Sequence, residues 1–338
     1  MDPAPDPSED PIVTLLESYN DFNSAQITVL YEEPSALEFM RYVAINRPFV
    51  VRGAANDWEA TRTWNVAKLN EIMGGLEVNV AITPKGNADS PTKDPSGTLL
   101  FIKPLEEKEE FTSFLTSLTT QELKGLTPGS LIKYAQTQNN NLNSEYTPLS
   151  THVPPSIPFS RLALQNQPDA VNLWIGNSHS VTALHKDPYE NIYVQILGAK
   201  HFVLLPPVMY PCIREKELKS ASYVRDSEGG LRIQLDGEGN EMVPFATWDP
   251  DEGIGGGGGV YERFARTMRV TLEKGDMLYL PALWYHKVSQ SCNEEGLCCA
   301  VNYWHDMEFG GSFYPLVNLV RNLTLAKEKE KKTADSSK

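Results

Sequence analysis

From about Val171 onward, the sequence is a succession of short β-branched and aromatic runs, each ended by turn residues. Runs of this kind are typical of strands in an antiparallel β-barrel or sandwich. Gly198-Ala199 separates two of them and predicts a hairpin between these neighbours. The runs that we expect to form strands are VNLWIGN, NIYVQIL, KHFVLLP, LRIQL, MRVTL, DMLYLP, HKVSQS and CCAVNYW.

Helical spacing of apolar residues marks the amino-terminal part of the chain, where Ser35 is a candidate N-cap. A further apolar run, PLVNLVRNLTLAKEKEK, predicts a helix that closes the β-rich part. We therefore expect a mainly β fold with flanking helices, built from a helical or mixed part (13–150) and a β domain with its closing helix (151–325). The amino-terminal segments that predict helices are PSALEFMRYVAIN, NVAKLNEIMGG and FTSFLTSLTTQEL.

Three segments lack the apolar spacing of a packed element. Residues 1–12 are acidic and rich in proline, and residues 326–338 are strongly charged, so both predict disorder. The glycine-rich stretch DPDEGIGGGGGVYE interrupts the strands and predicts a flexible surface insertion.

Composition narrows the functional classes. The formal net charge of -14 disfavours direct binding to nucleic acid, whose phosphates attract lysine and arginine, and fits a basic protein partner better. No apolar run is long enough to span a bilayer, and the amino terminus resembles neither a secretory signal nor a transit peptide. Four cysteines without a CxxC pair favour a reducing compartment, so we expect a cytoplasmic or also nuclear protein.

The segment LHKDPYEN places His185 and Asp187 two positions apart, where strand geometry directs both side chains to one face. A third ligand for a metal ion is available in GDMLYLPALWYHKV, which contains His286. Two histidines and one carboxylate form the facial triad of non-heme Fe(II) oxygenases and leave coordination positions open. Structural zinc sites prefer closed tetrahedral sets instead. The set therefore predicts Fe(II) and oxygen chemistry.

Lys200 begins the run that follows the Gly198-Ala199 turn. An ammonium group on an inner strand is unfavourable unless an anion pairs with it, because it loses its hydration. A keto acid that chelates Fe(II) and carries a distal carboxylate, namely 2-oxoglutarate, would occupy the open metal positions and pair with Lys200. The alternative is that Lys200 is a solvated turn residue.

The blocks HKDPYENIYVQILGAKHFVLLPP and GDMLYLPALWYHKV, followed by AVNYWHD, resemble the signature blocks of the jumonji-C (JmjC) 2-oxoglutarate oxygenases. The resemblance extends over roughly 31–325 and includes NRPFVVRGAANDW, VAITPKGNAD and LIKYAQTQNNNL. It implies a double-stranded β-helix, a jelly-roll fold of the cupin type. Its implied cofactors are Fe(II), 2-oxoglutarate and O2, with Fe(II) held by His185, Asp187 and His286.

The resemblance also implies residues that bind 2-oxoglutarate. Lys200 would pair with the distal carboxylate, Tyr134 and Thr182 would add hydrogen bonds, and Asn191 and Asn302 would lie near the cosubstrate or the metal. Strict alternation from His185 puts Thr182 on the opposite face, so its role requires a β-bulge or the start of a strand.

The branch of the family that the chain resembles implies hydroxylation of a lysyl residue at C3, in a developmentally regulated GTP-binding protein. It also implies that the chain forms a homodimer. Three alternatives remain: a lysine demethylase with the same triad, a histone-tail peptidase, and an inactive cupin-like binding module. We expect the remaining histidines (His152, His179, His201, His305) and three tryptophans (Trp174, Trp284, Trp304) to be structural.

Overall fold

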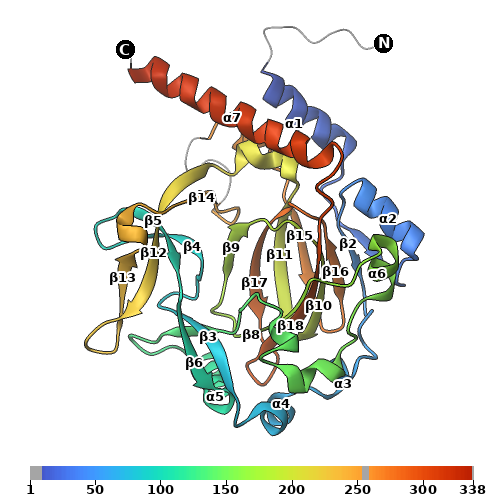
Figure 1. Ribbon diagram of the computed structural model, residues 1–338, viewed down its shortest axis with the longest axis vertical. Helices are drawn as coiled ribbons and strands as arrows, with labels where there is room; N and C mark the ends of the chain where they lie inside the picture. The colour runs from blue at the N-terminus through green and yellow to red at the C-terminus, as the bar shows by residue number, and fades with distance from the viewer. Residues whose placement is uncertain (1–9, 253–258, 337–338) are drawn as a thin grey trace.

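A computed structural model describes residues 10–252 and 259–336 of the chain. Its centre is a pair of β-sheets with helices at the periphery (Figure 1). In the described residues the larger sheet has the order β1 (Thr28–Leu30), β2 (Phe49–Val51), β16 (Met277–Leu280), β10 (Tyr189–Leu197), β18 (Cys298–Asp306) and β8 (Ala170–Gly176). The smaller sheet has the order β15 (Met268–Leu272), β11 (Ala199–Leu205), β17 (Tyr285–Ser291) and β9 (Thr182–His185).

Two further sheets lie beside this core. One contains β13 (Leu231–Leu235), β12 (Glu215–Arg225), β5 (Leu99–Lys103) and β4 (Ser90–Lys93), and β14 (Met242–Ala246) pairs with β12. The other contains β6 (Leu105–Glu110), β3 (Glu77–Thr83) and β7 (Ile132–Tyr134). The mainly β jelly-roll fold with flanking helices is thus confirmed, and every run predicted to form a strand does so.

The predicted helices are also present. Ser35 caps α2 (Ala36–Ala44) in a capping box with Glu38, and Asn65 caps α4 (Val66–Met73). The third predicted helix is α5 (Phe111–Lys124). Three further helices were not predicted from the sequence: α1 (Pro11–Phe22), α3 (Glu59–Thr63) and α6 (Pro158–Leu164). The described residues also form short 3₁₀ helices, which are η1 (Asn141–Asn143), η2 (Thr147–His152), η3 (Pro207–Cys212), η4 (Gly237–Gly239) and η5 (Glu262–Phe264).

Apolar side chains fill the space between the two central sheets. Phe202 and Leu204 from the smaller sheet meet Tyr193 and Leu278 from the larger one. The amino-terminal part is not separate from this core, because β2 extends the larger sheet by pairing with β16. Arg52, which follows β2, forms an ion pair with Asp276 at the start of β16.

The predicted hairpin at Gly198 is wrong. β10 pairs with β16 and β18 in the larger sheet, whereas β11 pairs with β15 and β17 in the smaller one. Gly198 adopts a φ of +68°, and a Cβ there would lie 2.4 Å from the Ser291 carbonyl oxygen. The glycine therefore allows the chain to pass abruptly from one sheet to the other.

Both ends of the described chain are more ordered than predicted. α1 begins at Pro11, and α7 (Phe313–Ser336) continues through the charged segment that the sequence predicted as disordered. The two helices lie side by side (Figure 1). Asp10 caps α1 and accepts hydrogen bonds from Tyr261 and from Lys327 of α7, while the alanine, lysine and glutamate of this segment have high helix propensity.

The other predictions of disorder concern residues 1–9, 253–258 and 337–338, which lie outside the described residues. Leu316, Leu319 and Leu323 are exposed on α7 at helical spacing, and the predicted homodimer stays a prediction. None of the described helices combines the length and apolar character that crossing a bilayer requires.

The crossover at Gly198 generates a stability prediction. We expect Gly198→Ala to lower the free energy of unfolding by at least about 1 kcal/mol more than Gly97→Ala, measured by chemical denaturation. Gly97 is a matched control because its φ is +88° but a Cβ there has nothing within 4 Å. Equal losses in the two variants would show that the close contact with Ser291 is unimportant.

Candidate metal centre

Three potential metal ligands converge at one end of the smaller sheet. His185 ends β9 and lies opposite His286 in the antiparallel register of β9 with β17. Asp187 Oδ2 is 3.7 Å from His185 Nε2 and 3.6 Å from His286 Nε2. Their potential ligand atoms all lie within 4.8 Å of one another. Among the described residues, this is the one such group of three or more His, Cys, Asp or Glu side chains.

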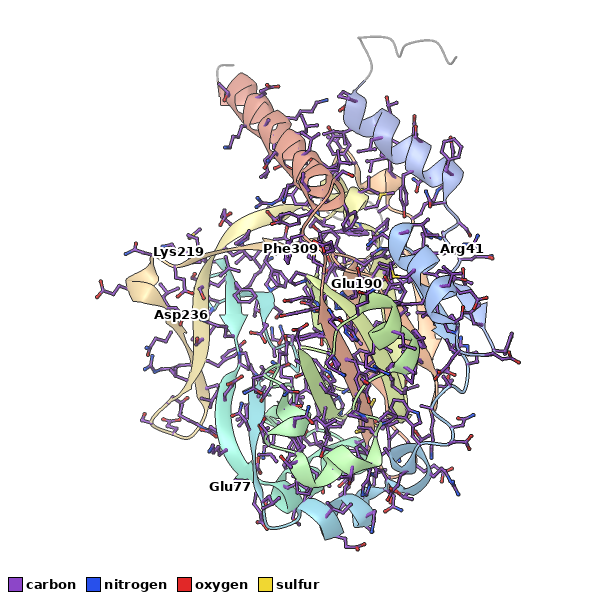
Figure 2. All side chains as sticks on the ribbon, turned by 45° about the vertical axis from the view of Figure 1, so that its right-hand side comes forward. Arg41, Glu77, Glu190, Lys219, Asp236 and Phe309 are labelled. Carbon is purple, nitrogen blue, oxygen red and sulfur yellow. The ribbon has the colours of Figure 1, made fainter. Side chains whose placement is uncertain are left out.

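The position of Asp187 differs from the sequence argument in one respect. β9 ends at His185, so Asp187 lies in the connection to β10 rather than on the strand. Its backbone carbonyl accepts a hydrogen bond of 2.8 Å from Leu283 N. Glu190, buried in the interior (Figure 2), accepts from Ala282 N and Tyr279 Oη and so holds the segment before Leu283. Backbone contacts therefore replace strand geometry in orienting Asp187.

The two imidazole rings turn their Nε2 atoms toward the centre of the group. His185 Nδ1 donates to the Ala183 carbonyl at 2.8 Å, and His286 Nδ1 donates to the Trp284 carbonyl at 2.9 Å. When Nδ1 carries the proton, Nε2 keeps its lone pair for a metal. Burial and the neighbouring His185 lower the pKa of His286 to about 4, so this ring is neutral near pH 7. The donor set therefore fits a divalent metal ion with open positions.

Lys200 lies deep in the same cavity and is only 2% exposed. Its Nζ donates to Tyr134 Oη at 3.0 Å and to Gln290 Oε1 at 2.6 Å. Both acceptors are neutral, and no carboxylate of the described residues pairs with the ammonium group. A buried cation without an anion is costly, so the cavity is suited to a ligand with a carboxylate. Gln290 was missed because its β17 run resembles an ordinary amphipathic strand.

Thr182 faces this cavity because β9 is irregular. The register pairs His185 with His286 and Thr182 with Val288, so β9 contains one more residue than β17 between these pairs. This is the β-bulge that the alternation argument required.

The two asparagines predicted near the cosubstrate contact each other. Asn302 Nδ2 donates to Asn191 Oδ1 at 3.1 Å, and Trp174 Nε1 donates to Asn302 Oδ1 at 2.8 Å. All eight residues predicted for the site line one cavity: His185, Asp187, His286, Lys200, Tyr134, Thr182, Asn191 and Asn302. Their roles in binding stay predictions.

Several other residues of the cavity were missed or assigned differently. Trp174 and Trp304 were expected to be structural but line the cavity, and Trp304 stacks on Tyr189 with ring centroids 4.6 Å apart. Trp284 is buried, as expected, and donates to Asn46. His152, His201 and His305 each contact other protein groups away from the cavity.

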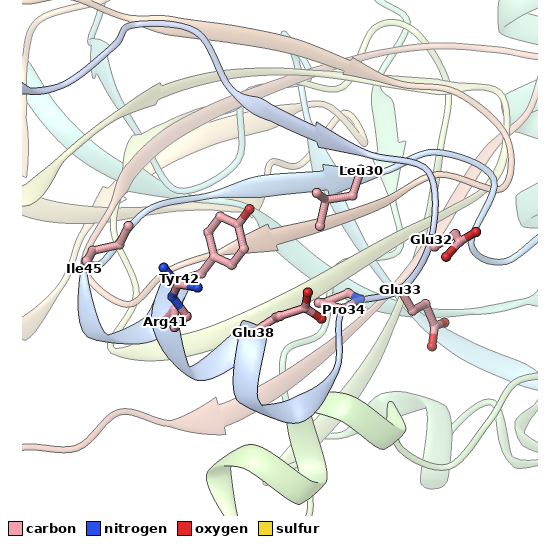
Figure 3. A pocket seen from close by; sticks show the side chains of 8 residues that line it. All are labelled: Leu30, Glu32, Glu33, Pro34, Glu38, Arg41, Tyr42 and Ile45. Atoms are coloured by element: carbon pink, nitrogen blue, oxygen red, sulfur yellow. The ribbon is translucent and has the colours of Figure 1, made fainter.

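A second pocket lies at α2, between Leu30 and Ile45 (Figure 3). Glu32, Glu33 and Glu38 line it, but the Glu38 carboxylate accepts hydrogen bonds from Ser35 in the capping box. The pocket contains no histidine or cysteine, so its chemistry does not match a transition-metal site.

Comparisons with known proteins agree with this geometry. The model of the cupin-like domain family matches residues 34–311. The chain is 37% identical to the JmjC domain-containing protein E of Dictyostelium discoideum over 300 residues, which cover 82% of this chain and 84% of that protein. It is 37% identical to the human bifunctional peptidase and (3S)-lysyl hydroxylase JMJD7 over 303 residues, 89% of this chain and 90% of the relative. It is 34% identical to the lysine-specific demethylase JMJ32 of Arabidopsis thaliana over 287 residues, 82% of this chain and 81% of that protein. The chain therefore belongs to the cupin-like family and, within it, to the JmjC oxygenases.

Proposed function

We propose that this chain is an Fe(II)- and 2-oxoglutarate-dependent oxygenase that hydroxylates a lysyl residue at C3 in a protein substrate, namely a developmentally regulated GTP-binding protein. One observation carries the proposal: an open set of three metal ligands and a buried, unpaired Lys200 share a single cavity. A zinc hydrolase would not require the second feature. Lysyl chemistry is supported by the relatives, since the human protein is named as a lysyl hydroxylase and the Arabidopsis protein as a lysine-specific demethylase.

His185, Asp187 and His286 would hold the metal through two Nε2 atoms and one carboxylate oxygen. Bound Fe(II), together with 2-oxoglutarate and O2, would supply the oxidising power to break a C–H bond, while 2-oxoglutarate is converted to succinate and CO2. The chain's own contribution is to fix the ligands. The backbone carbonyls of Ala183 and Trp284 set the tautomer of the two rings.

Lys200 would bind the distal carboxylate of 2-oxoglutarate. Tyr134 already contacts its ammonium group and would donate its own hydroxyl proton to the same carboxylate. Burial raises the pKa of the Tyr134 phenol, so the group remains protonated and able to donate. Thr182, Asn191 and Asn302 would add neutral polar contacts along the ligand. A largely desolvated cavity strengthens each of these interactions.

The substrate would approach from the open side of the cavity. Gln138, which is exposed, lines the cavity together with Trp304. The net charge of -14 favours a partner that presents a basic segment. The negative net charge fits a lysine-bearing protein substrate better than a nucleic acid.

We expect the purified protein, with Fe(II), 2-oxoglutarate and O2, to form succinate in proportion to the amount of a developmentally regulated GTP-binding protein added. Mass spectrometry should find one added oxygen on a lysyl residue of that protein, at C3. A control reaction without substrate should form far less succinate.

Other outcomes of this experiment would support other functions. Loss of a methyl group from a methylated lysine, without hydroxylation of the unmodified residue, would indicate a demethylase. Cleavage of a histone tail without consumption of 2-oxoglutarate would indicate a peptidase. Absence of metal binding and of succinate would indicate a binding module.

We expect Lys200→Met to weaken 2-oxoglutarate binding about 100-fold or more, because a charge-assisted contact is lost from a buried position. Calorimetry with Mn(II)-loaded protein measures this affinity. Lys186→Met is the matched control, since Lys186 follows His185 but its Nζ lies 5.2 Å from the Tyr285 ring centroid, outside the residues that line the cavity. Unchanged affinity in Lys200→Met would refute the assignment of Lys200.

Replacing Asp187 tests the metal assignment. Asp187→Ala removes one of three ligands from a half-buried position, so the fold should persist while affinity for Co(II) or Mn(II) falls about 100-fold or more. The absorption spectrum of the Co(II) form reports the change directly. Asp57→Ala, which removes an exposed carboxylate, should bind metal like the unaltered protein. Retention of full affinity by Asp187→Ala would contradict the assignment.

A further inference from the structure

Asp89 is a charged group directly before β4, the strand next to β9, and the cofactor assignment does not use it. It ends the loop between β3 and β4 and has a φ of 49°, an uncommon conformation that aspartate tolerates better than most residues. Its side chain is half-buried, and its Oδ2 accepts a hydrogen bond of 2.9 Å from Gln136 Nε2. The carboxylate is thus held in one place by a neutral amide.

No cation of the described residues forms an ion pair with Asp89. Lys103 acts on it only at a distance and pairs instead with Asp236, at 2.9 Å. The negative charge of Glu106 repels the Asp89 carboxylate and so disfavours its ionised form. Burial is the main reason that the pKa of the Asp89 carboxyl is raised. A carboxylate in such a position would gain from an ammonium group supplied by another molecule.

The loop that carries Asp89 is attached to the segment that precedes β9. Gly86 O accepts a hydrogen bond of 2.8 Å from Val181 N, and a Cβ on Gly86 would lie 1.9 Å from the His179 carbonyl oxygen. This close approach keeps β4 beside β9 (Figure 1). His185, at the end of β9, is close enough to Asp89 for a charge on its ring to act on this carboxylate.

Gln136 connects Asp89 to the opposite wall of the site. It follows Tyr134 by two residues and precedes Gln138 by two, and both of these residues line the cavity. Asp89 is thus joined by Gln136 to the segment between two residues that line the cavity, but it is neither a lining residue nor one of the potential metal ligands.

We propose that Asp89, held by Gln136, binds the ammonium group of the substrate lysine and so determines specificity for that residue. This inference rests on the proposed function. Hydroxylation at C3 leaves three methylene groups between the reacting carbon and the ammonium group. The ammonium group then extends past the metal centre and needs an anion at some distance from it, which is the position of Asp89.

The same geometry separates hydroxylation from demethylation. In a demethylase the reacting carbon is bonded to the side-chain nitrogen, so the nitrogen itself lies at the metal centre. Asp89 would then have no cation to bind. Recognition by Asp89 thus favours reaction at a carbon near the substrate backbone.

The test uses full-length protein loaded with Mn(II) and 2-oxoglutarate in the absence of O2. Its probes are two peptides that span the lysine modified in the GTP-binding protein, one with lysine and one with norleucine, which lacks the ammonium group. Fluorescence anisotropy measures their dissociation constants. We expect the unaltered protein to bind the lysine peptide at least about tenfold more tightly.

Asp89→Asn should bind the lysine peptide at least about tenfold more weakly than the unaltered protein, and should distinguish the two peptides by less than about threefold. The substitution is conservative, because asparagine tolerates this φ and its carbonyl oxygen can still accept from Gln136. Binding of 2-oxoglutarate should not change. An Asp89→Asn protein that keeps the full preference for lysine would overturn the proposal.

Glu106→Gln is the matched control for a general electrostatic effect. Glu106 is exposed and acts on Asp89 only through its charge, so its loss should change peptide affinity by less than about twofold at physiological salt. If Glu106→Gln weakened peptide binding as much as Asp89→Asn does, the effect would come from the general negative charge around Asp89. This result would refute a direct ion pair between Asp89 and the substrate lysine. If no lysine of the GTP-binding protein is modified, the proposed function fails first, and the role of Asp89 fails with it.

Discussion

The site depends on the antiparallel pairing of β9 with β17. This register brings His185 opposite His286, although 101 positions separate them in the sequence (286 minus 185). The extra residue of β9 in the same pairing turns Thr182 toward the cavity. A regular register would place either Thr182 or His185 on the outer face, because side chains alternate along a strand. One bulge therefore allows the proposed metal ligand His185 and the proposed cosubstrate contact Thr182 to come from the same four-residue strand.

Two charged groups, Lys200 in the cavity and Asp89 outside its lining, have no oppositely charged partner among the described residues. Lys200 is buried against neutral acceptors, and Asp89 is held by a neutral amide. Pairing either residue with an opposite charge of the protein would stabilise the free chain but would compete with ligands. Leaving charges without ion pairs lowers the stability of the free state, a cost that proteins accept at functional sites. In the proposed function, Lys200 would pair with a carboxylate of 2-oxoglutarate, and Asp89 would pair with the ammonium group of the substrate lysine.

The sequence predicted those parts of the structure that depend on local patterns. Short β-branched and aromatic runs identified the strands, the candidate cap Ser35 identified the start of one helix, and the spacing of His185 and Asp187 identified part of the cluster. Strand partners were not predictable, because Gly198 suits both a hairpin and a crossover between sheets. The order of the tail at Lys327 depends on Asp10, more than 300 positions away, which no local pattern contains. The roles of Gln136 and Gln290 likewise depend on partners distant in sequence.

The amino-terminal part and the central sheets contribute different residues to the proposed site. The central sheets carry His185, His286 and Lys200, which are proposed to bind the metal and 2-oxoglutarate. The amino-terminal part supplies Asp89 and Gln136 from connections that can vary without disturbing the central strands. It is nevertheless anchored to them, because β2 pairs with β16 and the β3–β4 loop contacts the segment before β9. If Asp89 binds the substrate lysine as proposed, substitutions in the β3–β4 loop should change which substrate is bound and leave the proposed metal and 2-oxoglutarate sites intact, since function resides in sites carried by a fold and not in the fold itself.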